Sequence, residues 1–385
     1  MMTWGWVRKA GVQSLGAVVV VAVCAPVAAC GASVAGTAQT SDGGRPPPSS
    51  APPVPTRAPG WTAEVELRGR PGEIPSPTGD LVAVIDGRSV CLRAGTDPTP
   101  RCVLRLAAGV TPRFVVFSPT GAHLLVVAGV ASRAEVYLVD AGSGAVRVIG
   151  RQGFEPAGAG ASRWDLSSAV WDVEGTAVLL VPRTTAASGP VIAVPVAGGT
   201  ASELLRLPAE LANSSPSLWT TATGLAVVPN SGESRNILWW ADFHTKQVEQ
   251  IGRYGDPGGS LLLGSADPLG RSVVVCPRRA DGRLGAAVGI SVLHRESARL
   301  LPDARTCAAS VFSADGRYLA VAAQLSRGYT LAVVEPSTGV TLLTVPLPVT
   351  MPSVPPYLTW AGDVIIASAV TGGWPVCSVV VRIRR

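Results

Sequence analysis

The chain has 385 residues, of which 47% are hydrophobic and only 15% are charged, with 43 glycines and 33 prolines. This length fits one large domain or two ordinary ones, and this composition suits many short buried strands joined by turns. The formal net charge is +6, but Lys9 and Lys246 are the only lysines. Arginine is therefore the default cation, and the arginine count excludes no class of partner and identifies none.

The first 29 residues have the pattern of a bacterial signal peptide rather than of a folded segment. Arg8 and Lys9 precede residues 10–29, which carry no charge, and small residues lead up to Cys30 in the sequence VAAC. This sequence resembles a lipobox, which implies cleavage before Cys30 and lipidation of that residue. We expect a lipoprotein on the outer face of the cell membrane. An uncleaved signal anchor is the alternative, because twenty uncharged residues can span a bilayer.

Residues 31–60 separate this segment from the rest of the chain. They are rich in Pro, Ser, Thr and Gly and hold almost no apolar residue that could be buried. We therefore predict an extended or disordered tether. The expected organisation is a signal peptide at 1–29, a lipidated cysteine with its linker at 30–60, and one folded domain at 61–385.

The rest of the chain repeats a pattern of strand, tight turn and strand. Residues 311–322 read VFSADGRYLAVA, in which Asp and Gly supply turn chemistry between two apolar runs. Residues 116–127, VFSPTGAHLLVV, are nearly a copy. The turn glycines recur at intervals of 42 to 54 positions, at Gly79, Gly121, Gly175, Gly224, Gly270, Gly316 and Gly362. A repeat of this length with four strands per unit is the signature of a β-propeller blade.

We therefore predict an all-β fold, a seven-bladed β-propeller whose antiparallel blades each hold strands A to D. Six blades are the alternative if the unit around Gly79 or Gly224 is not complete. The last unit contains strands at 357–360, 363–369 and 376–383, and then the sequence ends without a fourth. Residues 61–68 alternate like a strand before the first repeat. We expect them to complete the last blade, because such closure removes open sheet edges.

The repeated turns resemble the Phe/Trp-Ser-Pro-Asp-Gly turns that open the blades of TolB-like and WD-repeat propellers, and the resemblance covers residues 61–385. The excess of Ala, Gly, Pro, Val and Arg is similar to an actinobacterial-type coding bias. The whole is similar to a TolB-like propeller carried on an actinobacterial-type secreted lipoprotein. The resemblance implies architecture rather than function, because propellers host many unrelated activities.

Five cysteines follow Cys30, in a compartment that permits disulfides. Cys91 and Cys102 lie on predicted strands C and D of the first blade, where they can face each other. Cys276 and Cys307 are expected near one rim of two neighbouring blades, so this pair can also form. Cys377 is left over and is an alternative partner for Cys307.

No catalytic constellation emerges from the sequence. The three histidines and most candidate acids fall in turns, and predicted strands A, which line a propeller channel, offer mainly small neutral residues. We expect no metal site, no cofactor and no nucleic-acid partner. A monomeric binding or scaffold module for an envelope protein or anionic ligand is the favoured hypothesis. A propeller hydrolase, similar to lactonases, with a site in the channel is the alternative.

The long loops between strands B and C and between D and A are the candidate binding surface, because long loops on a rigid scaffold commonly carry binding residues. They are rich in arginine and contain few acids, which favours an acidic protein surface or an anionic polymer as partner. Two tryptophans in predicted loops are further candidates. The candidates are Arg133, Arg163, Trp164, Arg183, Arg235, Arg278, Arg279, Arg283, Arg327 and Trp374.

Overall fold

The computed structural model describes residues 61–68, 73–94, 97, 99–130, 133–150, 153–155, 164–301, 304, 306–325, 328–347, 357–371 and 374–384. All of them belong to one compact unit, Pro47–Arg385. The predicted signal peptide, Cys30 and linker lie outside the described residues. The described part of the chain holds no helix with the length and hydropathy needed to cross a bilayer.

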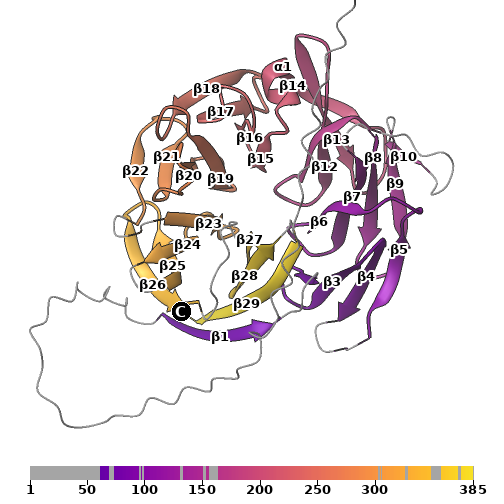
Figure 1. The fold of residues 1–385 in the computed structure, drawn as a ribbon, viewed down its shortest axis with the longest axis horizontal. Coiled ribbons are helices and arrows are strands. Elements are labelled where there is room, and N and C mark those ends of the chain that lie inside the picture. Colours follow the sequence, from indigo (N-terminus) through magenta and orange to yellow (C-terminus); the bar gives the residue numbers. More distant parts are fainter. Residues whose placement is uncertain are drawn as a thin grey trace, which may run out of the picture. The chain divides into compact units, whose positions relative to one another are not determined.

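Seven antiparallel sheets form a ring, and each sheet is one blade of a β-propeller (Figure 1). Blade 1 contains β2 (Glu73–Pro75), β3 (Leu81–Asp86), β4 (Ser89–Ala94) and β5 (Arg101–Arg105). Blade 2 contains β6 (Pro112–Phe117), β7 (His123–Val130), β8 (Arg133–Asp140), β9 (Val146–Gly150) and β10 (Gly153–Glu155). Blade 3 contains β11 (Leu166–Trp171), β12 (Ala177–Pro182), β13 (Ser188–Pro195) and β14 (Ser202–Pro208).

The remaining blades follow the same order from the innermost strand A to the outermost strand D. Blade 4 contains β15 (Ser217–Thr220), β16 (Gly224–Val228), β17 (Ile237–Asp242) and β18 (Val248–Arg253). Blade 5 contains β19 (Ser260–Ala266), β20 (Ser272–Arg278), β21 (Val288–Ser291) and β22 (Ser297–Arg299). Blade 6 contains β23 (Thr306–Phe312), β24 (Leu319–Leu325), β25 (Gly328–Glu335) and β26 (Val340–Pro346). Blade 7 contains β27 (Tyr357–Ala361), β28 (Val364–Thr371), β29 (Trp374–Arg384) and β1 (Thr62–Arg68).

The predicted seven-bladed fold is thus confirmed, with two additions that the sequence pattern did not indicate. The short strand β10 pairs with β9 and gives blade 2 a fifth strand. A single turn of helix, α1 (Ala209–Asn213), lies in the loop between blades 3 and 4.

The N-terminal strand closes the ring as predicted. β1 is antiparallel to β29, in a register that runs from Thr62 opposite Arg384 to Arg68 opposite Ser378. Trp61 is only 8% exposed and belongs to the apolar cluster between blades 6 and 7. Its ring meets that of Tyr318 edge-on, with 5.2 Å between centroids. The start of the domain is therefore packed against the core of its last two blades.

Glycine is required at the turn between β11 and β12 for two physical reasons. In the turn between β11 and β12 the N–H of Gly175 donates to the carbonyl of Asp172, and Gly175 has φ of 73°. L-residues with a Cβ rarely adopt this left-handed conformation. A Cβ at Gly175 would also lie 3.2 Å from the side chains of Ser118 and Pro119 in the preceding blade. The glycine therefore allows both the turn and the close packing of adjacent blades.

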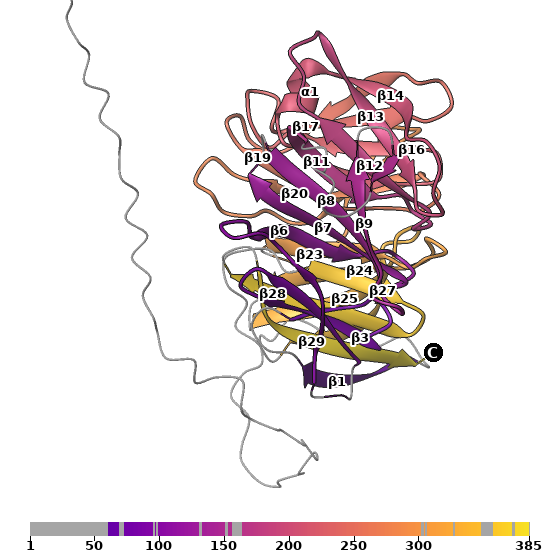
Figure 2. The same cartoon turned by 90° about the vertical axis from the view of Figure 1, so that its right-hand side faces the viewer.

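The strand order gives the domain two different rims. We call the rim that carries the A–B and C–D turns the short-turn rim, and the rim that carries the B–C and D–A loops the long-loop rim. The long-loop rim faces the viewer in Figure 1 and lies on the left in Figure 2, where β29 ends on the opposite side. Trp61 lies on the short-turn rim, because its neighbour Thr62 pairs with the end of β29.

Candidate binding rim

Six of the candidate arginines lie on the long-loop rim within the described part of the chain. Arg133 begins β8, Arg183 follows β12, and Arg278 ends β20. Arg235, Arg279 and Arg283 lie in the B–C loops of blades 4 and 5. Arg163 and Arg327 fall outside the described residues.

Arg183 connects the B–C loop of blade 3 to the D–A loop that leads into blade 4. Its Nη1 donates to the carbonyl of Asn213 at 3.3 Å, and its Nη2 donates to Oγ of Ser215 at 3.0 Å. Its Nε lies 3.6 Å from Asp165 Oδ1. Beside it, the Thr184 N–H donates to Asn213 Oδ1, and Asn213 Nδ2 donates back to the Thr184 carbonyl. These bonds hold two loops of different blades in one arrangement.

The same D–A loop is held from the other side by blade 4. Asn230 Nδ2 donates to the Ser215 carbonyl at 2.6 Å, and Ser231 Oγ donates to the Ser214 carbonyl at 3.4 Å. The loop is therefore clamped between the B–C loops of blades 3 and 4.

A second D–A loop, between blades 4 and 5, is clamped in the same way. Arg235 of blade 4 donates from Nε to the Gly259 carbonyl at 3.1 Å and from Nη2 to the Gly258 carbonyl. Arg279 of blade 5 approaches from the opposite side, with its Nε 3.3 Å from Asp256 Oδ2. Arg235 Nη1 has no hydrogen-bond partner among the described residues. This loop is thus fixed while Nη1 of Arg235 stays available.

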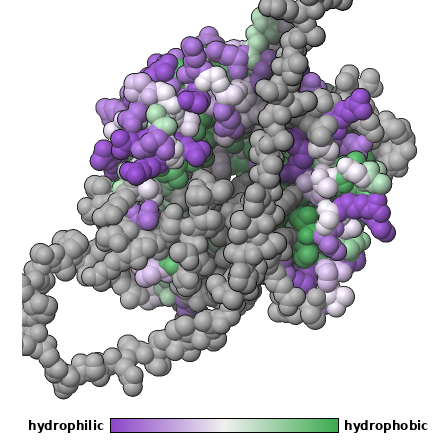
Figure 3. Space-filling model, in the orientation of Figure 1, coloured by the Kyte–Doolittle hydropathy of each residue, from purple (hydrophilic) through white to green (hydrophobic). Residues whose placement is uncertain are grey.

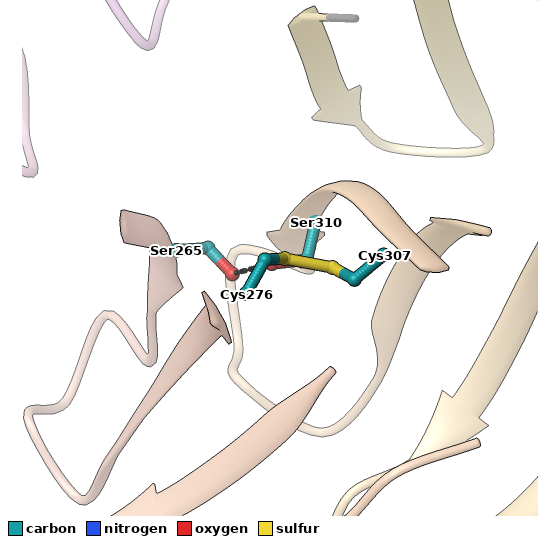
Figure 4. The surroundings of a disulfide bond; sticks show 4 residues. All are labelled: Ser265, Cys276, Cys307 and Ser310. Carbon is teal, nitrogen blue, oxygen red and sulfur yellow. Dashed lines mark hydrogen bonds between the residues drawn. A yellow bond between two sulfur atoms is a disulfide. The ribbon is translucent and has the colours of Figure 1, made fainter. Parts of the chain in front are cut away.

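The B–C loop of blade 5 is further tied to blade 6 (Figure 4). A disulfide joins Cys276 on β20 to Cys307 on β23, and both residues are almost fully buried. The Cys307 N–H also donates to the Gly285 carbonyl at 2.7 Å. The second predicted disulfide, Cys91–Cys102, joins β4 to β5 in blade 1. Both predicted pairings are present in the structure, and Cys377 is not the partner of Cys307.

The charge of this rim differs from the expectation of many arginines with few acids. Asp165 and Asp256 face Arg183 and Arg279, and Asp281 Oδ2 lies 3.9 Å from Arg283 Nε. Hydrophilic residues gather on this rim over blades 4 and 5 (Figure 3). The described rim therefore carries charges of both signs. Its most exposed cation in an ion pair is Arg283, whose side chain is 82% exposed.

Trp164 is buried rather than available to a ligand, and Trp374 does not lie in a loop. Trp164 is 3% exposed, its Nε1 donates to the Ile149 carbonyl at 2.9 Å, and its backbone pairs with Ala134. It is a core residue between blades 2 and 3, because its apolar ring fills that interface and its one donor is satisfied. Trp374 begins β29 rather than lying in a loop, and its side chain falls outside the described residues.

The inner strands contribute small polar residues, as the sequence indicated. Ser310 on β23 is 2% exposed, and its hydroxyl lies 2.9 Å from that of Ser265 on β19, which links blades 5 and 6 (Figure 4). Thr359 on β27 has a buried Oγ1 without a described partner. Within the described ranges, no group of three His, Cys, Asp or Glu side chains is placed to hold a metal ion.

The histidines lie on the short-turn rim, in blades 2, 4 and 5. His123 is half-buried beside Trp171, and its Nε2 lies 3.8 Å from Asp140 Oδ2. Burial lowers the pKa of His123, and the nearby carboxylate of Asp140 opposes that shift without reversing it. His123 is therefore mainly neutral at neutral pH and packs as part of the blade 2 turn.

Comparison with known proteins bears on the fold. No protein-family model and no curated protein sequence matches the chain. An oligogalacturonate lyase, solved in complex with manganese, superposes with a TM-score of 0.52 at 11% identity, over 83% of this chain and 91% of that chain. The chain has a β-propeller fold.

Two further solved structures are among those that match this chain. A chain of the mitotic checkpoint complex gives a TM-score of 0.51 at 13% identity, over 86% of this chain and 96% of that chain. TolB from Acinetobacter baumannii gives 0.37 at 14% identity, over 86% of this chain and 65% of that chain. At 11% and 13% identity, the two superpositions with a TM-score above 0.5 bear on architecture and not on substrate or partner.

Proposed function

We propose that this protein is a binding module of the cell envelope, held at the membrane by lipidated Cys30, and that its long-loop rim across blades 3 to 5 docks an acidic surface of an envelope protein. The observation that carries the proposal is the pair of clamped D–A loops. Each is fixed on both sides by side chains of the neighbouring B–C loops, among them Arg183, Arg235 and Arg279.

Fixed loops favour binding because little conformational entropy remains to be lost when a partner docks. Two nitrogens hold Arg235 in place and one holds Arg279, so the remaining N–H groups of these two residues can meet carboxylates in a set geometry. The acids on the same rim do not remove this capacity. Exposed ion pairs such as Arg279–Asp256 contribute at most about 1 kcal/mol, and a carboxylate of a partner can join them at the free N–H groups of the arginine.

The membrane location rests on the uncharged segment 10–29 and the lipobox-like VAAC before the linker. Its test is Cys30→Ala in the full chain. The wild type is expected in the membrane fraction, and the variant is expected to be released or misprocessed. Unchanged retention and mobility of the variant contradict a lipid anchor.

The docking surface is tested by charge reversal at a position that holds no loop in place. Arg283→Glu changes the highly exposed arginine on the long-loop rim of blade 5. Arg299→Glu is the matched control, since it makes the same charge change on β22, the outer strand of the same blade. Crosslinking and capture from native membranes should fall several-fold for Arg283→Glu and weaken with salt, and should stay unchanged for Arg299→Glu. Equal capture by both variants contradicts the proposal, as does a crosslinked species that survives protease treatment.

A further inference from the structure

Among the described residues, the large hydrophobic side chains that remain exposed are Leu269, Leu293 and Val340, at 51%, 80% and 50%. All three lie on the short-turn rim, in two adjacent blades. Leu269 lies in the A–B turn and Leu293 in the C–D turn of blade 5, and Val340 begins β26 just after the C–D turn of blade 6. This grouping is on the opposite side of the domain from the candidate binding rim.

The repeat itself shows that a leucine is unusual at position 293. Leu293 is the second residue after strand C of its blade. The same place in blades 2, 3, 4 and 6 is taken by a small or polar residue, namely Gly142, Ala197, His244 and Ser337. The backbone of the turn is shared, since the N–H of Arg295 donates to the Ser291 carbonyl as that of Gly144 donates to Asp140. The turn geometry therefore does not explain the leucine.

Leu269 is unusual in the same way. It lies directly before the turn glycine Gly270, and the equivalent position in blades 1, 2, 3, 4 and 6 holds a polar or charged residue. These residues are Thr78, Thr120, Glu174, Thr223 and Asp315. In blade 6 that residue stabilises the turn, because Asp315 Oδ1 accepts from Ser313 Oγ at 2.6 Å and from the Arg317 N–H at 3.1 Å. A leucine side chain makes neither bond. Blade 5 thus places an exposed apolar side chain at both of its turns where a polar one would serve the fold.

The two leucine-bearing turns form one fixed platform with cations beside it. The Val292 N–H donates to the Arg271 carbonyl at 3.0 Å, which joins the two turns of blade 5. The Arg271 side chain is ion-paired with the buried Asp267, and Arg295 is paired with Glu249 of blade 4. Both guanidinium side chains are more than half exposed. Exposed leucines flanked by long cationic side chains suit a membrane interface, where the apolar tip enters the headgroup region and the cations meet phosphates.

We propose that the short-turn rim of blade 5, with its edge at Val340 in blade 6, rests on the surface of the bilayer through Leu269 and Leu293. The inference rests on the lipid anchor of the proposed function. The described chain begins at Trp61 on this same rim, and thirty residues separate Trp61 from Cys30. That length spans at most about 100 Å, so an anchored domain stays close to the bilayer.

Tethering explains how so small an apolar surface can act. An anchored domain meets the bilayer at an effective concentration on the order of millimolar, so a contact too weak to recruit a free protein still orients a tethered one. In this orientation the long-loop rim faces away from the membrane, because the two rims are opposite faces of the ring. The rim proposed to bind a partner is then exposed to the envelope.

The test uses the full lipidated chain in vesicles of three parts phosphatidylcholine to one part phosphatidylglycerol. An environment-sensitive fluorophore is attached through Leu293→Cys, and in the matched control through Arg283→Cys on the long-loop rim, both in a Cys377→Ser background. At position 293 we expect a several-fold rise and a blue shift of the emission, with quenching by lipids that carry a quencher in their acyl chains. At position 283 the emission should stay that of an aqueous probe. A second variant, Leu269→Asp, should reduce the signal at 293 by several-fold without changing the thermal midpoint.

The other outcomes overturn the inference. If the protein binds vesicles but the probe at position 293 reports an aqueous environment, the membrane contact of blade 5 is wrong. This result does not contradict the lipid anchor or the proposed docking rim. Failure of the protein to float with vesicles instead points to the anchor, and so to the proposed membrane location. A signal at 293 that rises with protein concentration at fixed lipid indicates a second copy of this chain. A signal seen only in native membranes, and lost after protease treatment, indicates a protein occupant.

Discussion

Trp61→Ala tests ring closure at a single side chain. Trp61 is 8% exposed and packs in the cluster that joins blades 6 and 7, with its ring edge-on to Tyr318. Truncation of a buried tryptophan costs about 3–5 kcal/mol, of which the aromatic pair accounts for about 0.5–1.5 kcal/mol. With an unfolding entropy of about 2.1 cal/mol/K per residue over residues 61–385, each kcal/mol lowers the midpoint by about 1.5 °C.

The expected shift is therefore about 4–8 °C by differential scanning calorimetry or circular dichroism. Thr62→Ala is the control, because Thr62 is the adjacent residue on the same chain segment and is exposed. Its effect should stay within about 0.5 kcal/mol, below 1 °C. If the two variants melt within 1 °C of each other, the N-terminal strand does not secure the last blade, and the reasoning from Trp61 is wrong.

Three further predictions follow from the structure. Removal of the Cys276–Cys307 disulfide by Cys276→Ala with Cys307→Ala opens a loop of 31 residues and should lower the free energy of unfolding in urea by about 4 kcal/mol. Removal of Cys91–Cys102 by Cys91→Ala with Cys102→Ala opens a loop of 11 residues and should lower it by about 3 kcal/mol. A larger loss for the second pair than for the first contradicts the chain-entropy argument. The Thr245 N–H donates to the Asp242 carboxylate and is the main cause of the lowered pKa of Asp242. The ionised Asp242 therefore stabilises the fold above about pH 4, and this stabilisation is lost as pH falls through the lowered pKa. Asp242→Asn should therefore flatten the acid limb of the thermal midpoint between pH 7 and 3, and parallel profiles speak against this. Gly175→Ala should lower the thermal midpoint by more than Gly339→Ala. Both glycines have positive φ, but only at Gly175 would a Cβ meet a neighbouring blade.

The fold was predictable because its periodic features are local in the sequence. A turn such as Ser313-Ala314-Asp315-Gly316 specifies its own geometry, and the seven copies set the blade count. The missing fourth strand of the last unit predicted the pairing of β1 with β29, which the register confirms. The strand β10 and the helix α1 were not predicted, because each is stabilised by its neighbours rather than by a pattern of its own.

The site was predictable only in part, because its contacts join loops that are distant in sequence. The arginines of the B–C loops could be read from the sequence, whereas their partners Ser215, Gly259 and Asp256 become neighbours only when blades stack. Trp164 was misplaced for the same reason. It follows a predicted loop in the sequence, but its backbone pairs with that of Ala134 and its side chain packs in the core. A weak signal for this was present, since Trp164 lies only two residues before β11, where its apolar ring can reach the core between blades 2 and 3.

The most direct measurement of the central claim, that the long-loop rim is the working face, is photocrosslinking in native membranes from single positions of the lipidated full chain. One crosslinker replaces Arg283 on the long-loop rim, and the other replaces Glu203, an exposed residue of β14 on the outer edge of blade 3. The account predicts a discrete, salt-sensitive protein adduct from position 283 and none from position 203. An adduct from position 203 alone, or from neither position in membranes that retain the protein, contradicts it.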